Sequence, residues 1–353
     1  MKKILSIVLS LVLVMALCAT ASAAGLVGVA MPTQDLQRWN QDGANMKAQL
    51  EAAGYEVDLQ YANNDVGMQV SQIENMILNE VQVLVVASID GSALGTVLAQ
   101  AKEAGIPIIA YDRLLTNTDA VDYYTTFDNY KVGQIQGQYI VDKFDLANTD
   151  KTYTIEFTAG SPDDNNAGLF FGGAYDTVKP YLDAGKLVCV SGQTDFATVA
   201  TPAWKSETAQ ARMDNILSAY YPDALTGGQT LDIALCSNDS TALGVTNSLV
   251  AAGFTTENIP VITGQDCDKP NVKNMVKGLQ AMSVFKDTRT LAAQTVKMVD
   301  SLLKGETPEL NGEYDNGLKM VPSFNCTPVF GDVSNYEELL IASGYYTAEE
   351  IAE

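Results

Sequence analysis

Short apolar runs alternate with segments of helical periodicity along the first half of the chain. Between the runs, apolar residues recur three or four positions apart, as in Val70, Ile73, Met76 and Ile77. This alternation predicts strands that form a parallel sheet covered by helices. The strand-like runs are residues 26–30, 57–61, 83–87 and 106–110.

The same rhythm restarts after Phe127 and predicts a second unit of similar size. No stretch rich in glycine, proline or serine separates the two halves. We therefore expect two doubly wound α/β lobes, with the chain crossing between them through strands. The tail from residue 311 to 353 is long enough to return and pack on one or both lobes. The strand-like runs of the second half are residues 152–158, 187–190, 233–236, 261–263 and 281–285.

The run at residues 106–113 ends in adjacent Asp112 and Arg113. Its isoleucine-rich part predicts a strand buried on both faces of a parallel sheet. In open α/β sheets, ligands bind outside the carboxyl ends of the strands. The two charged residues therefore stand where such a fold binds its ligand. The alternative is that Asp112 caps a turn and pairs with Arg113 on the surface.

Residues 1–24 have the pattern of a cleaved secretory signal peptide. Lys2 and Lys3 precede an apolar run, and a small-residue cleavage site follows at 21–23. We expect the mature protein in the periplasm or on the outer face of the cell membrane. The apolar run is too short for a comfortable membrane span.

The chain of 353 residues is strongly acidic, with a formal net charge of −22. This charge argues against nucleic acid and anionic lipid surfaces as partners. The hydrophobic content of 47% is sufficient for full cores. The composition is that of a soluble protein outside the cytoplasm.

The absence of histidine removes several kinds of chemistry. Catalysis by Ser-His-Asp or Cys-His and every zinc site that needs histidine are excluded. The four cysteines after the signal segment have no metal-ligand spacing, and both disulfides and buried thiols remain open. We expect no metal and no cofactor. These cysteines are Cys189, Cys236, Cys267 and Cys326.

Polar side chains follow nearly every predicted strand. Carboxylates, amides and guanidinium groups can read adjacent hydroxyls in bidentate fashion. The only two tryptophans, Trp39 and Trp204, also follow strands, and aromatic rings can cover the apolar faces of a sugar ring. The pattern favours a polar, neutral ligand. The polar residues are Arg38, Asp112, Arg113, Asn166, Asn238, Asp266 and Lys286.

Each of these residues also has a structural interpretation. Trp39 could belong to a helix core, and Asn238 or Asp239 could cap a helix. Asp163 and Asp164 could cap the long helix that follows, which would leave Asn166 to face the cleft. No glycine-rich phosphate loop follows the first strand, which counts against a nucleotide enzyme. Each acid lies beside a cation or an amide, which disfavours the raised pKa that a glycosidase needs.

Eight stretches resemble the periplasmic monosaccharide-binding proteins of ABC transporters, in the group of xylose- and multiple-sugar-binding proteins. They span nearly the whole mature chain in one order. Asn238 is similar to the xylose type, whereas much of the rest is similar to the multiple-sugar type. The stretches are residues 38–43, 71–76, 110–113, 126–129, 160–167, 211–215, 264–266 and 285–287.

The resemblance implies a type I periplasmic-binding-protein fold, in which two lobes joined by three crossing strands close on a ligand like a Venus flytrap. We expect a signal peptide at 1–24, an N-terminal lobe of 25–128 plus 287–320, and a C-terminal lobe of 129–286 plus 321–353. The resemblance also implies a sugar sandwiched between Trp39 and Trp204. The implied polar contacts are Arg38, Asp112, Arg113, Asn166, Asn238, Asp266 and Lys286.

The function implied is capture of an aldopentose or aldohexose, such as xylose, glucose, galactose or arabinose, by hinge closure. The implied partner is an ABC permease, and a chemoreceptor is a second one. We expect a monomer that is not an enzyme. Two alternatives remain: an exported carbohydrate-active enzyme of the same fold, and a receptor for a sugar-derived signal molecule.

Overall fold

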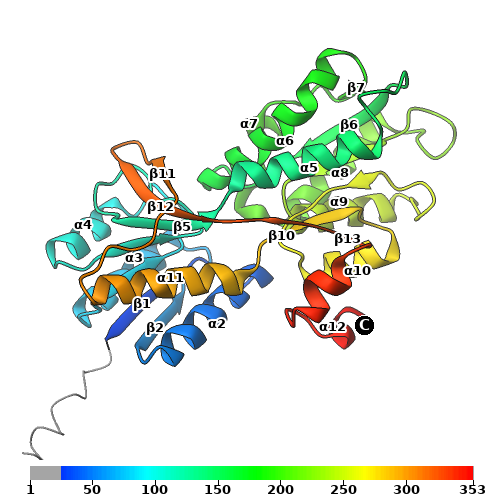
Figure 1. Ribbon diagram of the computed structural model, residues 1–353. Coiled ribbons are helices and arrows are strands. Elements are labelled where there is room, and N and C mark those ends of the chain that lie inside the picture. Colours follow the sequence, from blue (N-terminus) through cyan, green and yellow to red (C-terminus); the bar gives the residue numbers. More distant parts are fainter. Residues whose placement is uncertain (1–24, 353) are drawn as a thin grey trace, which may run out of the picture.

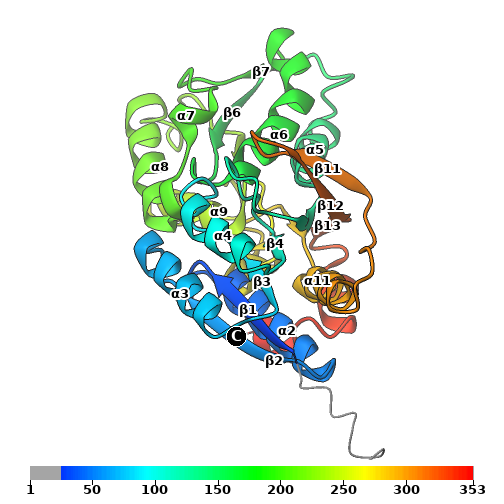
Figure 2. The same ribbon diagram turned by 90° about the vertical axis from the view of Figure 1, so that its left-hand side faces the viewer.

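The computed structural model describes residues 25–352, which form two lobes (Figures 1 and 2). The expected signal peptide lies outside these residues. Within them, no helix combines the length and the apolar character needed to cross a membrane. The predicted fold class, α/β with two lobes of mainly parallel sheet, is confirmed.

The first lobe is built on a seven-stranded sheet in the order β11-β12-β5-β4-β3-β1-β2. All neighbouring pairs are parallel except β11 and β12. Strand β4, which forms from the isoleucine-rich run at residues 106–113, lies in the middle, and all four of its residues are buried. The strands are β1 (Leu26–Met31), β2 (Glu56–Tyr61), β3 (Val83–Val86), β4 (Ile108–Tyr111), β5 (Tyr123–Phe127), β11 (Gly312–Asp315) and β12 (Met320–Cys326).

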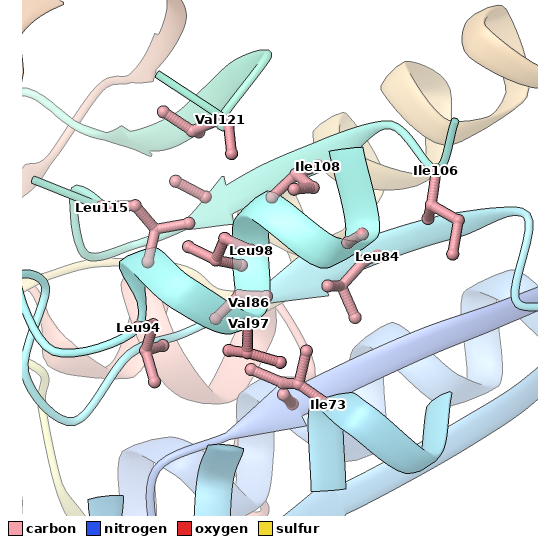
Figure 3. Packing of buried hydrophobic residues seen from close by; sticks show 14 of the residues in the cluster. Ile73, Leu84, Val86, Leu94, Val97, Leu98, Ile106, Ile108, Leu115 and Val121 are labelled. Atoms are coloured by element: carbon pink, nitrogen blue, oxygen red, sulfur yellow. The ribbon is translucent and has the colours of Figure 1, made fainter. Parts of the chain in front are cut away.

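Helices cover both faces of this sheet, as its uniformly apolar central strands require. On one face, α3 (Val66–Leu78) and α4 (Gly95–Glu103) bury Ile73, Val97 and Leu98 against β3 and β4 (Figure 3). On the other face, α2 (Gln37–Ala52) and α11 (Thr288–Leu303) pack together over the same strands. The central strands are therefore held from both sides.

The second lobe has the parallel order β7-β6-β8-β9, followed by the antiparallel pair β10-β13. A parallel bridge from Gln265 to Val284 links the end of β9 to β10. The carboxyl ends of β6, β8 and β9 thus point toward the same edge. The strands are β6 (Tyr153–Thr158), β7 (Leu187–Val188), β8 (Ile233–Cys236), β9 (Val261–Ile262), β10 (Met282–Phe285) and β13 (Val329–Asp332).

The helices of the second lobe form two pairs. α5 (Asn129–Lys143) and α6 (Asn165–Asp183) cover one face, and α8 (Ser206–Tyr220) and α9 (Asp239–Ala251) cover the other. α5 and α6 meet at glycines, since a Cβ on Gly133 would come 2.0 Å from the Phe170 carbonyl. The shorter helical segments are α7 (Phe196–Val199), η1 (Pro202–Trp204), α10 (Lys269–Lys277), the π-helical η2 (Glu337–Ala342) and α12 (Ala348–Ala352).

The chain crosses between the lobes three times, as expected. It passes from β5 into α5, from β10 into α11, and from β12 into β13, and the three crossings run side by side in Figure 1. After β13 the tail packs on α10 in the second lobe.

One of the expected lobe boundaries needs adjustment. The division at 320/321 falls inside β12, which pairs with β5 through Cys326 in the first-lobe sheet. The crossing at residues 326–329 is therefore the physical border. The remaining division of the chain between the lobes stays a prediction.

Candidate functional site

A cavity lies between the lobes, at the carboxyl ends of strands from both sheets, and its empty volume of about 420 Å³ includes space open to solvent. The first lobe contributes residues that follow β1 and β4, and the second lobe contributes residues that follow β6, β8, β9 and β10. Eight of the nine site residues predicted from sequence line it. They are Arg38, Trp39, Asp112, Arg113, Trp204, Asn238, Asp266 and Lys286.

Arg38 is the centre of the charge network. Its guanidinium contacts Asp42 at 2.7 Å, Asp112 at 2.6 Å and, across the cleft, Asp266 at 3.2 Å. Burial alone would lower the pKa of Arg38, but the three carboxylates outweigh it and hold the pKa above its ordinary value. Lys286 reaches the same Asp266 oxygen at 3.0 Å. A fixed fork of donors therefore faces the cavity from the first turn of α2.

Asp112 pairs with Arg38 rather than with its neighbour Arg113. Burial opposes ionisation of Asp112, but Arg38, Lys286 and Arg113 together lower its pKa. The surface salt bridge considered above is excluded, since the side chains of Asp112 and Arg113 are only 6% and 9% exposed.

Arg113 joins the two lobes beside the first tryptophan. Its Nε lies 3.0 Å from Asp164 Oδ2 in the second lobe. Its guanidinium carbon is 4.9 Å from the centre of the Trp39 ring, and that of Arg38 is 5.6 Å away. Trp39 is buried and packs on the first-lobe core while bordering the cavity. Its expected roles in the core and at the ligand are thus compatible.

Trp204 forms the opposite wall through an unusual backbone. Ala203 and Trp204 both have left-handed φ values, 54° and 57°, which side chains with a Cβ seldom adopt. Hydrogen bonds hold this conformation: the Ala203 amide donates to Ser161 Oγ, and Ser240 Oγ donates to the Trp204 carbonyl. The indole Nε1 donates to Asp164 Oδ2 at 3.2 Å. The ring is therefore fixed in place.

The second-lobe polar residues come from the starts of helices. Asn238 is the N-cap of α9, and its Oδ1 accepts from the Thr241 amide. The cap is thus Asn238 and not Asp239, which lies buried and accepts from Gln280 and Ser283. Because the cap uses Oδ1, the amide nitrogen is the part of Asn238 left for a ligand.

Asn166 is the one predicted residue that does not line the cavity. Its amide nitrogen donates to the Asp112 carbonyl at 2.6 Å, and its Oδ1 accepts from Tyr124 at 3.1 Å. Both ends of the Asn166 amide therefore hydrogen-bond to the first lobe, although Asn166 itself belongs to the second. A direct contact of Asn166 with a ligand stays a prediction.

Sequence reasoning missed several residues of the site. Asp42 lies one helical turn after Arg38, and this spacing was a usable signal. Asp164 was expected only as a cap of α6, yet it caps the helix and also pairs with Arg113 and Trp204. Gln265 lies in the resemblance stretch 264–266, from which only Asp266 was chosen, and nothing local marked Phe170 or Asp268, because tertiary folding brings them to the cavity. The unpredicted lining residues are Leu36, Asp164, Phe170, Ser240, Gln265 and Asp268.

None of the four cysteines after the signal segment lines this cavity. Cys189, Cys236, Cys267 and Cys326 are free thiols. In the part of the chain that the structure describes, no three acidic or cysteine side chains are grouped so that they could hold a metal ion.

Comparison with known proteins gives one family. The model of the periplasmic binding protein domain matches residues 27–307. The multiple sugar-binding periplasmic receptor of Rhizobium radiobacter is 49% identical over 94% of this chain and 94% of its own length. The D-xylose-binding periplasmic protein of Escherichia coli is 35% identical over 99% of this chain and 100% of its own length.

Two solved structures agree with this match. An ABC transporter solute-binding protein from Clostridium phytofermentans with bound β-D-glucose has a TM-score of 0.89 and 60% identity, covering 92% of this chain and 99% of that chain. A carbohydrate transporter solute-binding protein from Chloroflexus aurantiacus in complex with D-glucose has a TM-score of 0.82 and 33% identity, covering 92% and 97%.

Proposed function

This chain belongs to the periplasmic binding protein domain family, and we propose that it captures a monosaccharide outside the cytoplasm and delivers it to an ABC permease. The candidate ligands are aldopentoses and aldohexoses, with glucose and xylose first because related proteins carry or are named for them. Galactose and arabinose remain in the candidate set.

The cavity between the lobes is the observation that carries this proposal. Two buried tryptophans border it, and most of its polar lining residues carry a planar carboxylate, amide or guanidinium group. Charged groups make the stronger hydrogen bonds, and bidentate groups select the geometry of neighbouring hydroxyls. Such a lining suits a small neutral molecule that has hydroxyls at its rim and apolar faces.

The proposed mechanism is hinge closure. Residues of both lobes contact the sugar together only when the lobes are closed, so the sugar shifts the population toward the closed form. Arg38–Asp266 and Arg113–Asp164 already link the lobes, and the ligand adds to these contacts. A Kd of about 1 μM corresponds to about −8 kcal/mol in total.

The permease would recognise the two lobes in their closed arrangement. We further propose that the chain acts as a monomer after export, and that a chemoreceptor can use the same closed surface. The acidic surface and the predicted signal peptide support a location in the periplasm or on the outer face of the membrane.

We propose binding without catalysis. Asp112 and Asp266 line the cavity and each pair with Arg38, an arrangement that suits fixed acceptors better than proton transfer. The test is a thermal-shift panel of xylose, glucose, galactose, arabinose and ribose, with the solutions analysed afterwards for products. At least one sugar should raise Tm and be recovered intact, whereas conversion of the sugar would point to an enzyme.

A further inference from the structure

A groove opens beside the sugar cavity, also between the lobes. Its volume is about 1080 Å³, which includes space open to solvent. The first lobe contributes Gln37 and Asn64, and the second contributes Lys205, Glu207 and Asn271. The groove therefore has amide and charged side chains on both sides, which are groups that bind hydroxyls.

The groove and the cavity share part of their lining. Leu36, Ser240 and Asp268 border both of them. Ser240 already donates its hydroxyl proton to the Trp204 carbonyl, at 2.6 Å. Leu36 is apolar and Ser240 Oγ keeps only its acceptor lone pairs, so Asp268 is the charged acceptor at this junction.

Asp268 has an unsatisfied oxygen at this position. It precedes α10 as the N-cap residue, yet its side chain makes no capping hydrogen bond, unlike Asp65, Asp128 and Asp287 at their helices. Its Oδ1 is buried, and no described group donates to it. A buried acceptor without a partner is costly, so a ligand donor at this point would be favoured.

The loop holds this carboxylate in position. The Asp268 amide donates to Asp239 Oδ2 at 2.8 Å, and Asp239 is itself fixed by Ser283 and Gln280. The loop therefore keeps Asp268 at the border of the two spaces, and because its Oδ1 is buried, a ligand donor reaches this oxygen only after a local opening of the site.

We propose that the groove is a subsite for a second sugar ring, and that Asp268 accepts a hydrogen bond from the ligand where the two rings join. The ligand class is a disaccharide, one ring of which occupies the cavity. This inference rests on the proposed function, because the first ring must bind in the cavity. The amides of Gln37 and Asn64 and the charges of Lys205 and Glu207 then serve the hydroxyls of the second ring.

The experiment is calorimetric titration of the purified protein with glucose and with cellobiose, maltose, lactose and gentiobiose, which orient the second ring differently. The groove is tested with Lys205→Trp, which places a large ring at an exposed position on its rim. The matched control is Lys143→Trp, at an exposed position on α5 outside the groove. Asp268→Ala tests the junction.

We expect at least one disaccharide to bind within about tenfold of the best monosaccharide. Lys205→Trp should weaken that disaccharide at least about tenfold and leave the monosaccharide unchanged, and Asp268→Ala should also weaken the disaccharide about tenfold. Lys143→Trp should behave like wild type.

Several results would overturn the inference. If the monosaccharides of the panel bind but every disaccharide is weaker by more than about 100-fold, the subsite does not exist and the proposed function stands. If a disaccharide binds and neither Lys205→Trp nor Asp268→Ala weakens it, the second ring lies elsewhere. If no sugar binds at all, the proposed function itself fails.

Discussion

Asp112 organises the site through its backbone, and we propose that its side chain also contacts the ligand. Its φ of 59° is left-handed, a conformation that aspartate and asparagine tolerate better than most residues. Its carbonyl accepts from Tyr124, Thr126 and Asn166 at 2.7, 3.0 and 2.6 Å. The carboxylate is thereby directed at Arg38.

Asp112→Asn should impair binding more than folding. The substitution keeps the shape and the left-handed preference but removes the charge that Arg38 and the sugar hydroxyls use. Affinity for the best sugar should fall by about 1–3 kcal/mol, with a small change in the Tm of the unliganded protein. Calorimetry with and without sugar measures both effects.

Asp163→Asn is the matched control, because Asp163 is exposed and its neighbour Asp164 remains. If Asp112→Asn bound sugar normally but melted several degrees lower, the residue would be structural and not part of the ligand site.

Trp39→Ala should weaken sugar binding by about 1–3 kcal/mol, the usual loss for a buried aromatic contact. The ring borders the cavity and also supports the guanidinium groups of Arg38 and Arg113. Trp39→Phe keeps an aromatic face and should retain more of the affinity. An unchanged Kd for Trp39→Ala, measured by titration, would exclude stacking by this ring.

The unliganded protein should become more stable as the pH falls from about 8 to about 5. Burial raises the pKa of Asp42 to about 6 despite Arg38, and burial with repulsion from Asp266 raises that of Asp268 to about 7. In the unfolded chain both titrate near pKa 3.9. Above that pH the unfolded state has released protons that the folded state keeps, so stability decreases as the pH rises.

Calorimetric Tm values across this pH range provide the check. Asp268→Asn removes one of the two groups and should flatten the upper part of the profile. A wild-type Tm that increases steadily from about pH 5 to about pH 8 would contradict this account.

At the scale of elements, the turn after β6 determines the position of the Trp204 ring. Gly160 lies directly under the Trp204 ring, and a Cβ there would come 1.9 Å from a ring carbon. Only glycine permits this close approach. The turn between β6 and α6 and the segment before α8 thus fit together as one surface.

Gly160→Ala should displace the Trp204 ring and lower sugar affinity by about 1.4 kcal/mol or more, which is tenfold. Titration and tryptophan fluorescence would detect the change. Gly168→Ala is the control, because Gly168 lies in α6 with open space at its Cβ position, and alanine there should add about 0.5–1 kcal/mol of stability. Wild-type sugar affinity in Gly160→Ala would show that the position of the Trp204 ring does not affect binding.

Apolar periodicity predicted most strands and helices but not all of them. α5 was missed because the face that it buries includes Asn129, Gly133, Gln136 and Gly137, so its apolar pattern is weak. β5 was missed because its central residues are threonines. The hydroxyl of Thr125 is buried, and its hydrogen bond with the Thr295 hydroxyl offsets the cost of removing it from water. Tertiary contacts determine these elements, and local sequence carries little trace of them.

At the scale of the whole molecule, the positions of the site residues were predictable but their partners were not. The ends of parallel strands meet at one edge, so Arg38, Asp112 and Asp266 could be expected to converge. The Arg38–Asp112 pair, 74 positions apart, depends on packing within the first lobe, and the Arg38–Asp266 pair, 228 positions apart, depends on how the two lobes face each other. Asn166 shows the limit of such prediction. It follows β6, as expected of a site residue, yet its side chain hydrogen-bonds to the first lobe and does not line the cavity.

The residues that line the cavity come from both lobes. Leu36, Arg38, Trp39, Asp112 and Arg113 belong to the first lobe, and the remaining lining residues belong to the second. The central claim is therefore that one monosaccharide binds per chain, between the lobes.

Calorimetric titration of the purified protein with D-glucose and D-xylose tests this claim most directly. We predict saturable binding of at least one of them with one-to-one stoichiometry and a Kd of about 1 μM or tighter. Absence of saturable heat for both sugars at concentrations up to about 1 mM would contradict it.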